Sequence, residues 1–189
     1  MDQAGFDGWL ARARRHDPQA LATLVETYSP RVFGLLYRLT GSRETAEDLA
    51  QETFLRVVRA IDEYVHTGRF EVWLFRIAAN LARDRARSSR RRGVVLRLDG
   101  SREEAGPIEV RDGSASDPRV RLEQAEDAER LNACLDSLPE LDREIILLRH
   151  FSELSFKEIA EMLDIPLGTA LARAHRALAR LKQEFGEAG

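Results

Sequence analysis

Apolar residues recur every three or four positions along most of this chain, which is the spacing of one face of an α-helix. The alternating pattern typical of β-strands is nearly absent. Pro18 and Pro30 suit the first turns of helices, and Gly41 suits a helix end. We therefore predict an all-α protein with helices near residues 5–15, 18–28, 30–40, 43–61, 70–89, 122–137, 141–151, 155–163 and 167–185.

The helical pattern breaks between residues 93 and 119, where glycine, proline and serine accumulate among many acidic residues. This composition favours a flexible connection rather than a packed element. A chain of 189 residues has room for two small domains. We predict two small helical domains joined by a flexible acidic linker, with bounds at 1–92, 93–121 and 122–189.

The segment 153–182 carries two helical patterns that are joined by a short turn. Ser155 and Glu158 have the spacing of a capping box, which predicts that the first helix begins there. Pro166 disfavours helical backbone at Ile165, so the turn should lie at these residues. The arrangement predicts a helix-turn-helix, with the helix over 141–151 supporting it from behind.

The second helix of this motif has an apolar face and a basic stripe. Its helical periodicity assigns to the apolar face Leu167, Leu171, Ala174, Leu178, Leu181 and Phe185. Thr169, Arg173, Arg176 and Arg180 fall largely outside that face and could reach phosphates and guanine edges. A plain amphipathic helix with a solvated arginine face would show the same pattern, and the capped preceding helix is what favours DNA binding.

A polar cluster lies early in the helix predicted over 43–61. Asp48, Gln51 and Glu52 stand at i, i+3 and i+4, opposite an apolar side formed by Ala46, Ala50, Thr53 and Val57. Acidic residues near the start of a helix stabilise it through the helix dipole, which is the simpler interpretation of the residues alone. The alternative is a docking patch for a helix of a partner protein.

The helix predicted over 70–89 combines aromatic and basic residues. Its apolar face is formed by Phe70, Leu74, Ile77 and Leu81, and its polar stripe by Arg76, Asn80, Arg83 and Arg87. Aromatic rings stack on unpaired bases and arginines hold the backbone, so this mixture suits DNA whose strands have been opened. The alternative places the aromatic residues in the core, and we assign Trp73 to the core.

Charge is distributed unevenly along the chain. The formal net charge is −3, but residues 1–93 carry +4, residues 94–130 carry −4 and residues 131–189 carry −3. Any contact with DNA must therefore come from local basic patches rather than from a field over the whole molecule.

Several other classes of protein are disfavoured by the sequence. Cys134 is the only cysteine, which excludes an intramolecular disulfide and a cysteine-rich zinc site. The four histidines lack the spacing of metal ligands, and no nucleophile motif or phosphate-binding loop occurs. No signal-peptide pattern or membrane span is evident. We expect a cytoplasmic protein that is not an enzyme, holds no metal or cofactor, and does not insert into membranes.

Four segments together resemble one known family. They are A-E-D-L-A-Q-E-T-F-L-R, F-E-V-W-L-F-R-I-A-A-N-L-A-R-D, L-P-E-L-D-R-E-I-I-L-L-R and L-S-F-K-E-I-A-E-M-L-D-I-P-L-G-T, in that order. In the order of these segments, in the distances between them and in the linker that divides them, the chain resembles the bacterial extracytoplasmic-function (group 4) sigma factors. The resemblance covers about residues 18–92 and 125–185.

The resemblance implies a specificity subunit that directs core RNA polymerase to promoter DNA and initiates transcription. By this resemblance Asp48, Gln51 and Glu52 match the patch for the clamp helices of the polymerase. Residues of the helix from 70 to 87 and of the loop before it match the part that captures the minus-ten element: Arg69, Phe70, Arg76, Asn80, Arg83 and Arg87. The helix-turn-helix matches the reader of the minus-thirty-five element, and the acidic linker matches the segment that threads toward the RNA exit path. An anti-sigma factor is an expected partner.

One departure from the family stands at the start of the second helix of the motif. Where the family usually shows V-K-S-R, this chain has Ala170-Leu171-Ala172-Arg173. The family pattern would expose position 171, whereas the apolar periodicity of this helix places Leu171 on the packed face. We expect altered or weakened reading of the minus-thirty-five element.

Three alternatives remain open at this point. The chain could be a helix-turn-helix regulator that acts independently of the polymerase. This interpretation gives no role to the polar cluster of Asp48, Gln51 and Glu52 or to the basic helix predicted over 70–89. It could be a sigma-like adaptor that binds polymerase and reads promoters poorly. An enzyme is the third alternative, and nothing in the motifs favours it.

Overall fold

The computed structural model describes residues 3–65, 69–91 and 130–186, and the predicted linker at 93–121 lies outside this part of the chain. The chain divides into two compact units, Met1–Asp99 and Gly100–Gly189. Within the described ranges every regular element is an α-helix, which confirms the all-α prediction.

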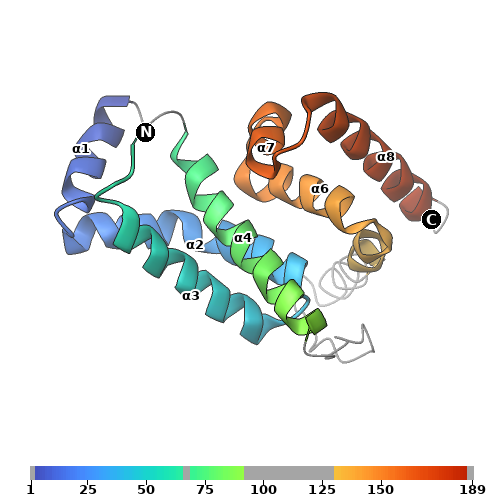
Figure 1. Ribbon diagram of the computed structural model, residues 1–189, viewed down its shortest axis with the longest axis horizontal. Helices are drawn as coiled ribbons and strands as arrows, with labels where there is room; N and C mark the ends of the chain where they lie inside the picture. The colour runs from blue at the N-terminus through green and yellow to red at the C-terminus, as the bar shows by residue number, and fades with distance from the viewer. Residues whose placement is uncertain (1–2, 66–68, 92–129, 187–189) are drawn as a thin grey trace, which may run out of the picture. The chain divides into compact units, whose positions relative to one another are not determined.

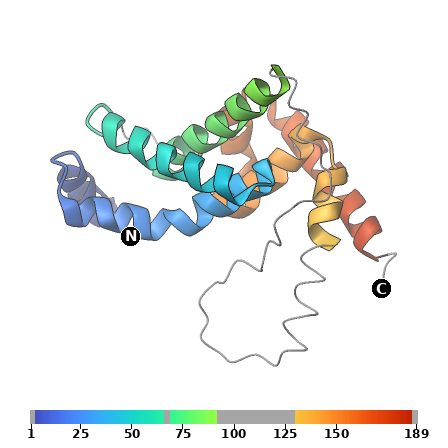
Figure 2. The same ribbon diagram turned by 90° about the horizontal axis from the view of Figure 1, so that it is seen from below.

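In the first unit the first helix of the chain is short and packs against the second helix, and the longer second, third and fourth helices pack against one another (Figure 1; Figure 2). The short connection at Gly41 and Ser42 makes the second and third helices an antiparallel hairpin. The elements are α1 (Gln3–Ala13), α2 (Pro18–Thr40), α3 (Arg43–Ala60) and α4 (Phe70–Arg91).

Local signals fix the ends of these helices. The carboxylate of Asp17 accepts a hydrogen bond from the backbone N–H of Ala20 at 2.9 Å, which caps the start of α2. Gly41 ends α2 with a left-handed backbone, φ 68°, a conformation that costs glycine little. Ser42 then caps α3 through the backbone N–H of Thr45.

Helix α2 runs unbroken through Pro30, so the prediction of two helices at 18–28 and 30–40 was wrong. A proline inside a helix removes one backbone hydrogen bond and costs about 3 kcal/mol. The cost is offset because both sides of Pro30 contribute to one buried face. Leu24 precedes the proline on that face, and Val32 and Leu35 follow it.

Phe70 lies at the centre of an aromatic cluster that joins α1, the middle of α2 and the start of α4. Its ring is 2% exposed and has a ring centroid 5.3 Å from that of Trp9 and 5.5 Å from that of Tyr64. The cluster consists of Phe6, Trp9, Tyr28, Tyr64, Phe70 and Trp73. Trp73 is partly buried there, in line with its assignment to the core.

The second unit is a helix-turn-helix backed by two further helices. Residues 130–137 form the described part of the helix predicted at 122–137. The remaining helices are α6 (Glu140–Ser152), α7 (Phe156–Leu163) and α8 (Leu167–Gly186). Helix α6 packs against both α7 and α8, so the predicted supporting role of this segment is confirmed (Figure 1).

The predicted capping box and turn are both present. Ser155 accepts a hydrogen bond from the backbone N–H of Glu158, whose carboxylate accepts one from the backbone N–H of Ser155 at 2.7 Å. Asp164 ends α7 with a left-handed backbone, φ 55°, and α8 begins three residues later. Sequence signals thus set the start of α7 and the length of the turn.

We predict that Phe70→Ala lowers the free energy of unfolding of the first unit by about 3–5 kcal/mol, because it empties the centre of a packed cluster. Trp9 and Trp73 are the only two tryptophans of the chain and both contact Phe70, so denaturation followed by tryptophan fluorescence reports on this unit. Arg12→Ala, at an exposed site on α1, is the control and should change stability by less than about 0.5 kcal/mol. An equally small effect of Phe70→Ala would contradict this role for the cluster.

Candidate nucleic-acid interface

Helix α8 packs on the rest of the second unit through alanines. Ala170, Ala174 and Ala177, at steps of four and three, are all buried. Leu167 is 43% exposed, Leu171 45% and Leu178 53%, so the predicted apolar face was wrong at these three positions. Small side chains let one helix approach another closely, and the alanine stripe therefore turns the leucines toward solvent.

The exposure of Leu171 decides between the two interpretations that the sequence left open. Position 171 lies on the surface, as the family pattern would have it, and not in the core. Periodicity failed here because Ala170, Ala174 and Ala177 recur at the same helical spacing beside the leucines, and it is the alanines that pack. The residues that pack α8 could have been found only by comparing the two overlapping stripes, one of alanines and one of leucines.

The four polar residues predicted to bind DNA on α8 have different surroundings. The guanidinium of Arg173 donates to the carboxylate of Asp142 at 2.7 Å, and Asp142 is only 5% exposed. Thr169 is partly buried, and its backbone N–H donates to the carbonyl of Pro166. Arg176 is exposed, and Arg180 is exposed but paired with Glu184 at 2.7 Å.

The Arg173–Asp142 pair joins α8 to the first turn of α6. A buried carboxylate is stabilised by a hydrogen-bonded cation, and losing one partner of such a pair is costly. This arrangement gives Arg173 a structural role that the sequence did not reveal, since the two residues stand 31 positions apart. Of the four predicted residues, Arg176 is the one whose charge faces solvent without an acidic partner in the described part of the chain.

A second polar contact holds the far end of α8. The Ser137 hydroxyl donates to the Glu184 carboxylate at 2.9 Å, and Arg180 donates to the same carboxylate. Arg180, followed by Ser137, lowers the pKa of Glu184 below its ordinary value. These contacts tie residues 130–137 to α8, well away from its first turn.

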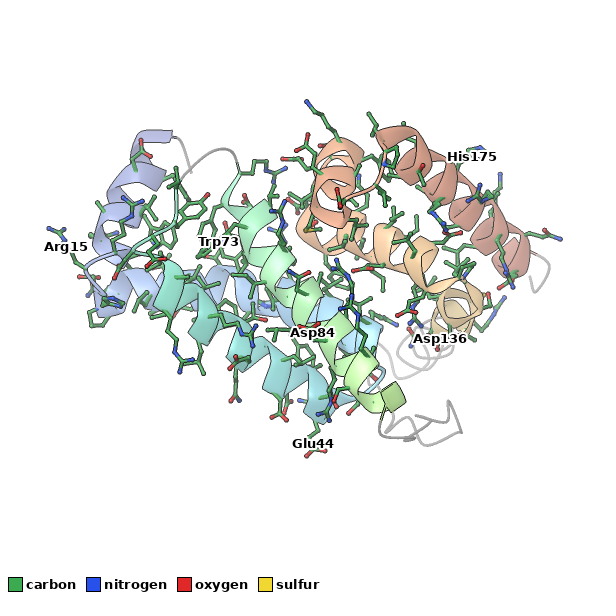
Figure 3. All side chains as sticks on the ribbon, in the orientation of Figure 1. Arg15, Glu44, Trp73, Asp84, Asp136 and His175 are labelled. Carbon is green, nitrogen blue, oxygen red and sulfur yellow. The ribbon has the colours of Figure 1, made fainter. Side chains whose placement is uncertain are left out.

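The polar stripe predicted on α4 lies on the surface. Arg76 and Asn80 are exposed, and the guanidinium of Arg83 donates to the Asn80 amide oxygen at 2.7 Å. Arg87 is exposed and lies 3.5 Å from the carboxylate of Asp84, which is labelled on the same helix in Figure 3. The structure therefore brings the predicted side chains of this helix together on one accessible side.

Phe70 does not belong to this surface. With its ring enclosed by five other aromatic rings, it offers no free face to a base in this conformation, which argues against the predicted contact with the minus-ten element. Arg69, by contrast, is exposed at the start of α4 and lies 3.7 Å from the carboxylate of Glu71.

Glu71 also links this helix start to α2. The hydroxyl of Tyr28 donates to its carboxylate at 3.1 Å. Burial, and secondarily the charge of Glu71, raises the pKa of Tyr28 above its ordinary value. The tyrosine therefore keeps its proton, and with it the hydrogen bond, throughout the neutral range.

The polar cluster on α3 lies opposite the buried side of that helix. Asp48 and Gln51 are exposed, whereas Glu52 is partly buried and pairs with Arg56 at 2.7 Å. Leu55, which is 49% exposed, continues this side by one turn and was not singled out from the sequence. The predicted buried side is confirmed at Ala46, Ala50, Thr53 and Val57.

The described residues form neither a cluster of metal ligands nor a membrane-spanning helix. Across residues 3–65, 69–91 and 130–186, histidine, cysteine and acidic side chains do not gather in a group that could hold a metal ion. Among the helices in these ranges, each is too short or too polar to cross a membrane.

Comparison with known proteins places both units in related families. Residues 24–92 match the family described as Sigma-70 region 2, and residues 128–181 match Sigma-70, region 4. Over 179 residues the chain is 31% identical to the ECF RNA polymerase sigma factor SigW of Bacillus subtilis, covering 93% of this chain and 94% of that protein.

Two further proteins extend the comparison. The chain is 38% identical over 181 residues to the ECF RNA polymerase sigma factor SigE of Mycolicibacterium smegmatis, covering 96% of this chain but only 63% of that relative. A solved structure of the sigma factor RpoE with the anti-sigma factor NepR, from Bartonella quintana, has a TM-score of 0.63 at 22% identity. It covers 87% of this chain and 96% of the matched chain, a likeness of fold.

We predict that Ala174→Leu destabilises the second unit by about 1–3 kcal/mol, because the larger side chain overfills a close contact between helices. Leu171→Ala, a change of the opposite sense three positions away on the exposed side, should alter stability by less than about 0.5 kcal/mol. Thermal unfolding followed by circular dichroism measures both. A larger loss in Leu171→Ala than in Ala174→Leu would contradict the assignment of the packed face.

Proposed function

Because this chain belongs to the extracytoplasmic-function sigma factors of bacterial RNA polymerase, we propose that its two units bind polymerase and promoter through separate surfaces. As a sigma factor, the chain binds core RNA polymerase and directs it to promoter DNA for transcription initiation. The observation that carries this function is the order of region 2 and region 4 in one chain. A regulator that acts without polymerase would not need region 2, so that alternative is not favoured.

The proposed division of labour follows the bounds expected from the sequence. Residues 1–92 bind the polymerase clamp and the minus-ten element, and residues 122–189 bind the minus-thirty-five element. Residues 93–121 form the linker, and the net charge of −4 over residues 94–130 suits a channel built for RNA. Sigma factors are DNA-binding initiation factors, and we propose that this chain acts in the cytoplasm without catalytic activity of its own.

The docking surface for polymerase is the α3 patch at Asp48, Gln51 and Glu52. Its support is the exposure of Asp48 and Gln51 on a helix whose opposite side is buried. The pairing of Glu52 with Arg56 holds that carboxylate at the edge of the patch. Leu55 lies on the same exposed side of α3 and adds an apolar surface against which a helix of the polymerase can pack.

We expect Asp48→Ala/Gln51→Ala/Glu52→Ala to lose most binding to core RNA polymerase from the host of this protein, by tenfold or more if the three contacts together supply at least about 1.4 kcal/mol. The measurement is a pull-down with purified components, followed by titration. The matched control removes the same three residue types elsewhere on the unit, in Gln19→Ala/Glu26→Ala/Asp62→Ala, where all three side chains are exposed. Equal binding by both triple variants would refute this docking surface, and no binding by the unaltered chain would refute the sigma-factor function itself.

The surface proposed for the minus-ten element is the exposed side of α4 with Arg76, Asn80, Arg83 and Arg87. Its support is that these side chains share one accessible side while the aromatic residues of the same helix are mostly packed inside. Arginines there can neutralise phosphates of the separated strand, and the Arg83–Asn80 hydrogen bond orients the amide. Arg69 extends the positive surface toward the loop that precedes the helix.

We predict that Arg76→Ala/Asn80→Ala reduces promoter opening at least fivefold while leaving the affinity for core polymerase unchanged, because only contacts with the opened strand are removed. Permanganate reactivity of unpaired thymines near the start site measures the opening. Arg12→Ala, which removes an exposed arginine from α1, is the control. Normal opening by the double variant would exclude this side of α4.

The chain as a whole is acidic and its basic residues lie in local patches, so we propose that the free chain binds promoters weakly. Bound to polymerase, its two units are held at a defined spacing, and two weak contacts then act as one. We also propose an anti-sigma factor as a partner. This proposal is supported by the likeness in fold to RpoE of Bartonella quintana, which was solved in complex with the anti-sigma factor NepR.

A further inference from the structure

The start of α8 exposes apolar side chains that its own unit does not use for packing. Leu171 is 45% exposed and Ala172 is exposed, although both stand within the first two turns of the helix. The packing of α8 is accomplished by the alanine stripe, with Ala170 and Ala174 on either side of them in sequence. The exposed pair is therefore available to a binding partner.

Polar side chains do not compete with this pair at the same end of the helix. Arg173 is held by Asp142 on the side of α8 that faces α6. Thr169 is partly buried. Gly168 has no side chain, and a β-carbon there would meet no atom within 4 Å, so the backbone at this point is open to a close approach. A ligand that reaches the first turns of α8 meets mainly carbon atoms.

The chemistry of the major groove identifies what such a surface can recognise. In a helix-turn-helix, the N-terminal residues of the second helix contact the edges of the bases. The C5-methyl group of thymine is the apolar group that bases present in that groove, and alkyl side chains contact it. We propose that Leu171 and Ala172 recognise thymine in the upstream promoter element through its methyl group, an inference that rests on the proposed function of this helix.

The next turn of the same side supplies polar contacts that complement this recognition. His175 stands four positions after Leu171, and Arg176 stands four positions after Ala172, so the two pairs share one exposed side. His175 projects from α8 on the side away from α6 (Figure 3). The charge of Arg176 can neutralise a phosphate or reach a guanine edge, which would hold the helix in the groove while the apolar pair contacts thymine.

The test removes the methyl group and nothing else from the DNA. Holoenzyme assembled from the full chain and core polymerase selects its preferred promoters from a pool of DNA fragments. Each thymine of the selected upstream element is then replaced by deoxyuridine, and the affinity of the holoenzyme is measured. We expect at least one replacement to weaken binding about fourfold, the effect of leaving one methyl-sized group uncovered.

In the same measurement with Leu171→Ala, replacing the affected thymine by deoxyuridine should weaken binding less than twofold. Leu178→Ala is the matched control, because it makes the same change at an exposed leucine two turns further from the start of the helix. It should keep the full sensitivity of the unaltered chain.

The outcomes separate this inference from the function on which it rests. Promoter binding that is insensitive to every deoxyuridine, or equally sensitive in Leu171→Ala, overturns the recognition of thymine and leaves the sigma-factor function standing. Weaker binding of Leu171→Ala to core polymerase, with unchanged sensitivity, assigns the leucine to a protein contact and also overturns it. Failure of the unaltered holoenzyme to select any promoter overturns the proposed function and this inference together.

Discussion

The close packing of α8 through Ala170, Ala174 and Ala177 is the constraint on which the candidate DNA surface depends. A stripe of small side chains fixes how the helix is rotated about its own axis, because only this stripe allows the close approach to the rest of the unit. That rotation decides which residues face outward. It places Leu171 on the surface although leucine is the more hydrophobic residue, and it leaves the basic residues of the helix in unequal surroundings.

The ion pair between Arg173 and Asp142 adds a second constraint on the same helix. Asp142 is buried in the first turn of α6, and a carboxylate in that position needs a hydrogen-bonded cation to offset its lost hydration. Arg173 supplies the cation from the flank of α8. A positive charge that the sequence alone assigns to DNA binding is thereby drawn into the contact between two helices, and the proposed recognition of DNA depends on residues on the outward side.

In the first unit, too, the side chains that pack and the side chains proposed to bind DNA differ, and here they lie on different sides of one helix. Helix α4 directs Phe70 into a cluster of six aromatic rings and directs Arg76 and Asn80 outward. The cluster fixes the start of the helix and connects it to α1 and α2. The side of α4 that we propose to bind DNA is thus carried on a firmly packed element, which limits the entropy lost on binding.

Much of this protein follows from local rules in its sequence. The period of the apolar residues determined the all-α class, the capping box at Ser155 and Glu158 determined the start of α7, and the buried side of α3 was evident from its spacing. Local rules wrongly predicted a helix break at Pro30, because the cost of that proline is offset by packing on both sides of it. They wrongly placed Leu171 in the core, because the leucines and the alanines of α8 both recur at helical spacing. Only the tertiary structure decided which stripe packs, that Arg173 is held by Asp142, and that Phe70 is enclosed. Each of these outcomes depends on residues distant in the chain, whose contacts no local pattern encodes.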